Sequence, residues 1–204
     1  MVSFAPLQRS DHAVIIETIE KEMHLEKYIA NPLIRRLHAR SFFYEELAQA
    51  THVFAAYDDG EFAGLVLLRL DGHKPQGMPL WARALSAVVH QLEKKEDGIA
   101  AYARTNAQLL EQYQRQHGTD GEILLLSANP RHRVRGIGSA LLSQVATVAQ
   151  GKHLYLFTDE GCTFEFYNRK GFHRVGEQTM EFNYAGKPHS FRCFLYSTTI
   201  GAGE

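Results

Sequence analysis

A basic, glycine-containing stretch from Arg131 to Ser139 holds residue types that could do chemistry. Arginines alternate through its first half, and Gly136 and Gly138 stand where a helix is expected to begin. The first backbone N–H groups of a helix have no intrahelical acceptor and carry partial positive charge, so a phosphate group binds there readily. Glycines allow such a group to approach the backbone, and arginines add favourable charge. The stretch therefore predicts a site for an anionic, phosphate-bearing ligand.

Two well-known phosphate motifs do not fit this stretch. The absence of Gly-Lys-Ser and Gly-Lys-Thr excludes a Walker loop. A dinucleotide fingerprint would need Gly or Ala where Leu141 stands, and Pro130 and a basic turn separate the glycines from the preceding strand. These residues alone do not exclude the alternative of a strand-to-helix turn that contains glycines but binds no ligand.

The segment before the glycines completes a more specific pattern. Leu126-Ser127-Ala128-Asn129-Pro130, followed by Arg133, Gly136 and Gly138, resembles the GCN5-related N-acetyltransferase (GNAT) superfamily. The signature of that family is Arg or Gln, two residues, Gly, one residue, and Gly or Ala. It follows a leucine-x-small-x-proline approach, which this segment also matches.

A second segment, about 30 residues later, supports the resemblance. Phe164 to Phe172 is similar to the phenylalanine-tyrosine-x-x-x-glycine-phenylalanine element of the same family. One position departs from the pattern, since members often carry Asn seven residues before the tyrosine and this chain has Glu160. The resemblance covers Glu122 to about Val175 well.

The resemblance implies a GNAT fold with acetyl-CoA as the acyl donor. We expect a mixed, mostly antiparallel sheet of about seven strands, a central splayed parallel pair, helices on both faces and an inserted helical hairpin. In the family, a bulge separates the strand before the loop from its parallel neighbour, and the pantetheine arm enters the cleft. The implied cofactor contacts are Leu126, Ser127, Ala128, Arg133, Val134, Arg135, Gly136, Ile137, Gly138 and Ser139.

Two residues are candidates for proton transfer. The ordinary pKa of a tyrosine, about 10, suits Tyr167 to protonate a CoA thiolate, and the resemblance implies this role. The alternative is a half-buried tyrosine that only packs the cofactor. Glu122 stands where some family members carry a glutamate that takes the amine proton, directly or through water. The alternative is a solvated carboxylate at a strand end.

Other titratable residues are weaker candidates. Surface charge or cofactor contact explains Asp159, Glu160 and His132 without chemistry. Cys162 has no nearby basic partner in the sequence, so we expect a core or wall cysteine in place of an acyl-cysteine.

Composition limits the partners. Lys and Arg total 22 against 23 Asp and Glu, which gives no reason to expect general binding to nucleic acid or an anionic membrane. The 11 histidines show no His-x-x-x-His spacing, so no metal is expected. Two cysteines cannot build a disulfide framework, and the N-terminus lacks the order of a secretory signal. We expect a cytoplasmic protein.

Hydrophobic periodicity and turn residues predict one domain over residues 1–200, a helical insertion over 73–120 and a flexible tail over 201–204. The insertion is expected to contain two amphipathic helices, with Trp81, Leu85, Val88, Val89 and Leu92 forming one buried stripe. Strands are expected at 4–7, 52–57, 62–70, 122–128, 153–158, 174–182 and 190–197, and helices after Ser10-Asp11 and at 33–50, 136–150 and 163–170.

The sequence does not identify the acceptor amine. The leading hypothesis is N-acetyl transfer to a small-molecule primary amine, directly in a ternary complex. The alternatives are transfer to a protein or peptide amine and a non-catalytic acyl-CoA-binding module that senses metabolic state. The insertion is expected either to roof the acceptor cleft or to form a decorative or dimer-forming helical pair.

Overall fold

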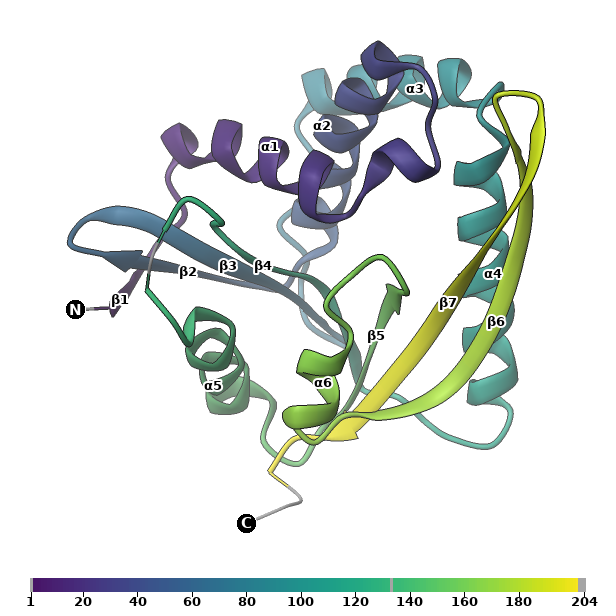
Figure 1. The fold of residues 1–204 in the computed structure, drawn as a ribbon. Helices are drawn as coiled ribbons and strands as arrows, with labels where there is room; N and C mark the ends of the chain where they lie inside the picture. The colour runs from purple at the N-terminus through teal and green to yellow at the C-terminus, as the bar shows by residue number, and fades with distance from the viewer. Residues whose placement is uncertain (1, 133, 202–204) are drawn as a thin grey trace.

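The order of helices and strands follows the predicted sequence of elements (Figure 1). The computed structural model describes residues 2–132 and 134–201, so Arg133 and residues 202–204 of the predicted tail lie outside the described residues. The elements are β1 Val2–Ala5, α1 His12–Glu22, α2 Pro32–Gln49, β2 His52–Asp58, β3 Glu61–Leu70, α3 Leu80–Glu93, α4 Asp97–Gln114, β4 Gly121–Ala128, α5 Ile137–Ala149, β5 His153–Asp159, α6 Glu165–Arg169, β6 His173–Tyr184 and β7 Lys187–Thr199.

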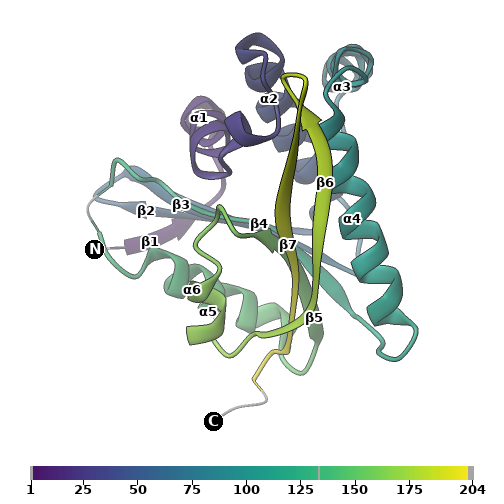
Figure 2. The same cartoon turned by 45° about the vertical axis from the view of Figure 1, so that its right-hand side comes forward.

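The seven-stranded sheet has the order β1-β2-β3-β4-β5-β7-β6. Every pair is antiparallel except the central pair β4 and β5, as predicted. In Figure 1, α1, α2 and α3 lie on one side of the sheet and α5 and α6 on the other. Figure 2 shows α4 running beside β6, against which it packs. The expected mixed α/β fold with helices on both faces is confirmed.

Strand β3 explains why the sheet needs helices on both faces. Its run of apolar residues is buried throughout, with Leu65 and Leu67 packing under α1 and α2 while Val66 and Leu68 pack against α5. Side chains alternate along a strand, so a continuous apolar run places a hydrophobic surface on each face. Full burial of each such side chain stabilises the fold by about 1.5–3 kcal/mol.

The central parallel pair is splayed. β4 and β5 pair only at Gly121↔Leu154 and Glu122↔Tyr155. On its other side, β4 pairs Ile123 with Leu68 and Leu125 with Leu67, so Leu124 is the extra residue of a bulge. Because a bulge bends its strand, the ends of β4 and β5 diverge beyond this point and leave an opening in the middle of the sheet.

The N-terminal elements differ from the prediction in detail. The first strand is Val2–Ala5 and not 4–7, since Pro6 cannot donate to the ladder with β2. Asp11 precedes α1 without capping it by a side-chain bond. Its carboxylate instead accepts hydrogen bonds from Tyr57 Oη at 2.6 Å and Gln8 N at 3.2 Å.

Helix α3 corrects the predicted apolar stripe. The buried face carries Ala82, Ser86, Val89 and Glu93, whereas Val88 is 60 % exposed and Trp81 51 % exposed. α3 packs on α2 through its small and polar face, because α2 offers polar partners to the side chains of that face. Two polar contacts of this face join the helices. They are Ser41 Oγ to Ser86 Oγ at 2.8 Å and His38 Nδ1 to Glu93 Oε1 at 2.6 Å.

Two further details lie near the C-terminal half. The last hairpin is longer than predicted, since β6 and β7 pair up to Tyr184↔Lys187. Gly98 is the second residue of α4, and an added Cβ there would meet Tyr28 O at 2.6 Å. The glycine therefore permits close packing of α4.

Candidate active site

A cavity of about 360 Å³ occupies the opening between β4 and β5. It reaches α1 and α4 on one face of the sheet and α5 and α6 on the other, which Figure 1 places on opposite sides. Its lining consists of Thr18, Ile19, Glu22, Met23, Tyr102, Ile123, Leu124, Leu125, Leu126, Ser127, Ala128, Gly138, Leu156, Phe157, Thr158, Cys162, Thr163, Phe166, Tyr167 and Arg169.

The start of α5 forms one end of this cavity. Gly136 has φ +85°, a left-handed conformation that a side chain would oppose, and its carbonyl accepts the first helical bond from Ala140 N at 2.9 Å. In the described part of the chain, the amides of Gly138 and Ser139 therefore have no acceptor. An added Cβ at Gly138 would lie 3.0 Å from the ring of Phe166, so the glycine allows α5 and α6 to approach at the cavity.

Asn129 shapes the turn between β4 and α5. Its backbone N–H donates to Ala63 O at 2.8 Å and its side-chain amide donates to Phe62 O at 2.8 Å. Its side-chain oxygen accepts from Arg131 N at 3.1 Å. These bonds fix the loop to β3, which positions the start of α5 beside the cavity.

The predicted cofactor residues separate into two groups. Leu126, Ser127, Ala128 and Gly138 line the cavity. The other described residues do not line it: Ile137 is buried in the core between the sheet and α5, Val134 packs against the same core, Arg135 is exposed and Ser139 lines a neighbouring groove.

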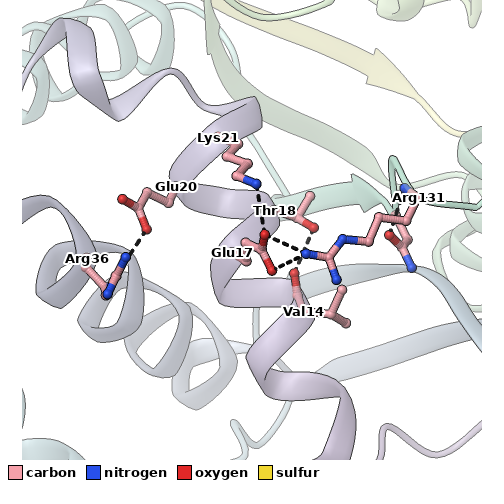
Figure 3. Close-up of polar contacts among 8 residues, drawn as sticks. Val14, Glu17, Thr18, Glu20, Lys21, Arg36 and Arg131 are labelled. Carbon is pink, nitrogen blue, oxygen red and sulfur yellow. Dashed lines mark hydrogen bonds and ion pairs between the residues drawn. The ribbon is translucent and has the colours of Figure 1, made fainter. Parts of the chain in front are cut away.

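Arg131 takes a position that sequence reasoning did not foresee. Its guanidinium binds both carboxylate oxygens of Glu17 on α1 at 2.6 Å (Figure 3). The same carboxylate accepts Lys21 Nζ at 2.8 Å. The loop before α5 is thus tied across the sheet to α1, and the charge of Glu17 is neutralised.

Tyr167 lines the cavity, as a proton donor to a bound ligand would have to do. Its ring packs at centroid distances of 5.7 Å from Phe172 and 6.0 Å from Tyr196, which hold the side chain in place. Burial raises the pKa of the Tyr167 hydroxyl above its ordinary value. Among the described residues this hydroxyl has no hydrogen-bond partner, so it can serve a ligand.

Glu122 lies in a network beside the cavity but not in its wall. Its Oε2 accepts Arg69 Nη2 at 2.7 Å and Tyr155 Oη at 2.9 Å. Burial raises the pKa of the Glu122 carboxyl, while the Arg69 charge opposes that rise. Glu46 of α2 belongs to the same region, and burial, followed by the negative charge of Glu122, raises its pKa to about 8.

The environments of the four weaker candidates do not favour a catalytic role. Burial raises the pKa of the Cys162 thiol to about 12, which disfavours the thiolate that acyl transfer through cysteine needs. Asp159 accepts Tyr28 Oη at 2.6 Å, and Glu160, at the position where the family often has Asn, binds Arg192 Nε at 2.8 Å. The buried Nδ1 of His132 has no hydrogen-bond partner in the described chain.

Sequence reasoning missed the residues at the far end of the cavity. Glu22 ends α1, Met23 follows it, and Tyr102 comes from α4. Nothing local in the sequence shows that α4 packs against β6 and so brings Tyr102 to the cavity. Within the described residues, no group of three or more His, Cys, Asp or Glu side chains could hold a metal ion, and no helix is long and apolar enough to cross a membrane.

A sequence model of the Acetyltransferase (GNAT) family matches residues 16–172. The match includes the cavity-lining parts of α1, α4, β4, α5, β5 and α6. No curated protein sequence matches the chain.

Solved structures share the fold at low sequence identity. A Corynebacterium glutamicum protein described as histone acetyltransferase HPA2 and related acetyltransferase has a TM-score of 0.56 and 16% identity, covering 100% of this chain and 99% of its own. The PaiA N-acetyltransferase of Thermoplasma acidophilum, solved with coenzyme A, has a TM-score of 0.52 and 14% identity, covering 98% of this chain and 99% of its own. The ribosomal-protein-S18-alanine N-acetyltransferase of Escherichia coli has a TM-score of 0.52 and 13% identity, covering 100% of this chain and 97% of its own.

Proposed function

Because the chain belongs to the GNAT acetyltransferase family, we propose that it transfers the acetyl group of acetyl-CoA to a primary amine of a small molecule. The observation that carries this proposal is a single cavity that joins three features. It begins at the start of α5, passes Tyr167 and ends between α1 and α4. A donor and an acceptor can therefore meet inside the sheet.

The described residues fit an acyl-CoA donor. The amides of Gly138 and Ser139 are available to a pyrophosphate, and the dipole of α5 favours negative charge there. Leu126 to Ala128 have lost β5 as a pairing partner, because the ladder between the strands ends at Glu122. Their backbone edge can accept an extended arm. Arg133 remains a proposed contact that lies outside the described residues.

Tyr167 is proposed to act as the general acid. When bound, acetyl-CoA supplies a thioester whose acyl carbon an amine can attack directly. The raised pKa of Tyr167 keeps its proton on the hydroxyl at neutral pH, and the free hydroxyl can donate this proton to the departing sulfur. The high pKa of Cys162 supports direct transfer in a ternary complex over a cysteine intermediate.

Glu122 is proposed to accept the proton of the acceptor amine through water. Its carboxylate does not line the cavity, whereas Ile123 and the residues after it do. Arg69 favours the ionised carboxylate, and burial makes that carboxylate more basic than an ordinary glutamate. The carboxylate of Glu122 is therefore the group that we propose takes the proton.

Tyr102 supports a small acceptor. It lines the cavity from α4, as does Met23 just after α1, so we propose that α4 narrows this end as a roof would. Purified protein incubated with acetyl-CoA and a mixed panel of small amines and peptides should release free thiol with small amines. Release only with peptides would favour a protein acceptor. Coenzyme A binding without release would favour a sensor.

A further inference from the structure

Three carboxylates of α1 differ in what they contact. Glu17 is bound by Arg131 at 2.6 Å and by Lys21 at 2.8 Å, and Glu20 lies 3.8 Å from Arg36 Nε (Figure 3). Glu22 is exposed and lines the cavity, and its carboxylate has no partner among the described residues. The negative charge of Glu22 therefore stays available to a ligand.

The surroundings of Glu22 strengthen the negative potential at this end of the cavity. Glu22 is the last residue of α1, where the helix dipole places partial negative charge. Lys27 packs over the ring of Phe191 and does not line the cavity.

The cationic side of the cavity lies elsewhere. Among the described residues that line it, Arg169 is the one cation and Glu22 the one anion. Arg169 ends α6, beside Tyr167 and on the face of the sheet that carries α5. The cavity is therefore polarised, with positive charge at the donor end and negative charge at the acceptor end.

Apolar and aromatic residues lie around Glu22. Ile19, Met23 and Leu124 offer a surface for an alkyl chain, and the rings of Tyr102 and Phe157 can attract a cation through their faces. The nitrogen that attacks the thioester must be neutral. A charge that Glu22 attracts must consequently sit on a second nitrogen of the same molecule.

On the basis of the proposed acetyl transfer, we propose that the acceptor is a diamine or polyamine, and that Glu22 determines this specificity by binding the ammonium group that does not react. An acceptor with a carboxylate in that place would be repelled by Glu22. The reacting amine lies between Glu22 and Tyr167, and the alkyl chain spans the apolar part of the wall.

The test compares acceptors of equal length that differ only in the far group. Diaminopentane, pentylamine and aminopentanoate present a cation, a methyl group and an anion, and the same series can be built on propane, butane and hexane chains. We expect kcat/KM to be about tenfold higher for the diamine than for the monoamine, which corresponds to about 1.4 kcal/mol. The aminoalkanoate should be the poorest acceptor.

Variants of α1 show whether Glu22 is responsible for the preference for diamines. Glu22→Gln should lower kcat/KM for the diamine about tenfold and change that of the monoamine by less than about twofold. Glu22→Lys should make the aminoalkanoate the better acceptor. Glu20→Gln is the matched control, because it removes the same charge from α1 away from the cavity, and the preference should stay as in the parent.

The outcomes separate the two proposals. Thiol release from the parent enzyme with no preference for diamines, or an equal loss for all acceptors in Glu22→Gln, would overturn the assignment of the acceptor and leave acetyl transfer intact. Release with none of the amines, together with no binding of coenzyme A, would overturn both.

Discussion

The carboxyl of Glu46 provides a prediction whose size can be worked from the structure. This side chain lies on α2 near the Glu122 network, and burial, followed by the charge of Glu122, raises its pKa from 4.5 to about 8. A carboxyl with a raised pKa in the folded state keeps its proton after the unfolded chain has lost it. The protonated carboxyl therefore makes its full contribution to the free energy of unfolding below pH 4.5, and this contribution is lost as pH rises towards 8.

The magnitude follows from linkage. Each pKa unit corresponds to about 1.4 kcal/mol, so the interval from 4.5 to about 8 sets a ceiling of about 5 kcal/mol. Glu46 is partly exposed, so solvent screens the interactions of its charge and we expect about 2 kcal/mol. Glu46→Gln should match the parent protein near pH 5 and exceed its free energy of unfolding by about 2 kcal/mol near pH 8.5.

Urea unfolding followed by far-ultraviolet circular dichroism at several pH values measures this difference. Glu61→Gln is the control, because Glu61 is exposed at the start of β3, and it should change the free energy of unfolding by no more than about 0.5 kcal/mol. A difference between Glu46→Gln and the parent that stays constant from pH 5 to 8.5 would refute the reasoning.

Three substitutions in the candidate site give further predictions. Tyr167→Phe should lower kcat by about 100-fold through loss of the proton donor, with the Kd for coenzyme A within about twofold by calorimetry. Glu122→Gln should lower kcat/KM at least about tenfold and remove the fall in rate on the acid side of the pH profile, since a base with a raised pKa loses activity as pH falls through it. Gly136→Ala should weaken coenzyme A binding about tenfold, because a side chain at φ +85° costs about 1–2 kcal/mol.

Each of these predictions has a result that would contradict it. A collapse of coenzyme A affinity in Tyr167→Phe would make the tyrosine a packing residue. If Glu122→Gln kept the parent's pH profile but unfolded more easily, the carboxylate would serve only the network with Arg69 and Tyr155. Unchanged affinity for coenzyme A in Gly136→Ala would show that binding does not depend on the left-handed turn at Gly136. Tyr184→Phe removes a hydroxyl that donates to Glu26 O at 2.6 Å outside the cavity wall, so it controls for the loss of a tyrosine hydroxyl that only stabilises the fold.

The strand-to-helix unit could be predicted from the sequence because its information is local. Leu126 to Pro130 and the two glycines define a strand end, a turn and a helix start within a few residues, and Gly136 takes the left-handed conformation that its residue type permits. The parallel pair followed from the alternation of strands and helices. These features need no knowledge of distant contacts.

The features that could not be predicted all depend on such contacts. Arg131 was expected near phosphate, yet its contact is Glu17, 114 residues away in sequence. The face that α3 buries follows from Ser41 and His38 on another helix, and these polar partners outweigh the larger apolar side chains. Tyr102 enters the cavity only because α4 folds back along β6. Periodicity indicates which residues share a face but not what that face meets.

The central claim is that the free amides at the start of α5 bind the diphosphate of coenzyme A. Isothermal titration calorimetry of the whole chain with coenzyme A, alongside dephospho-coenzyme A and pantetheine, tests it most directly. The account predicts saturable binding of the first two compounds and a large loss of affinity for pantetheine, which lacks the diphosphate. Equal affinity for all three, or no binding of coenzyme A at millimolar concentration, would contradict it.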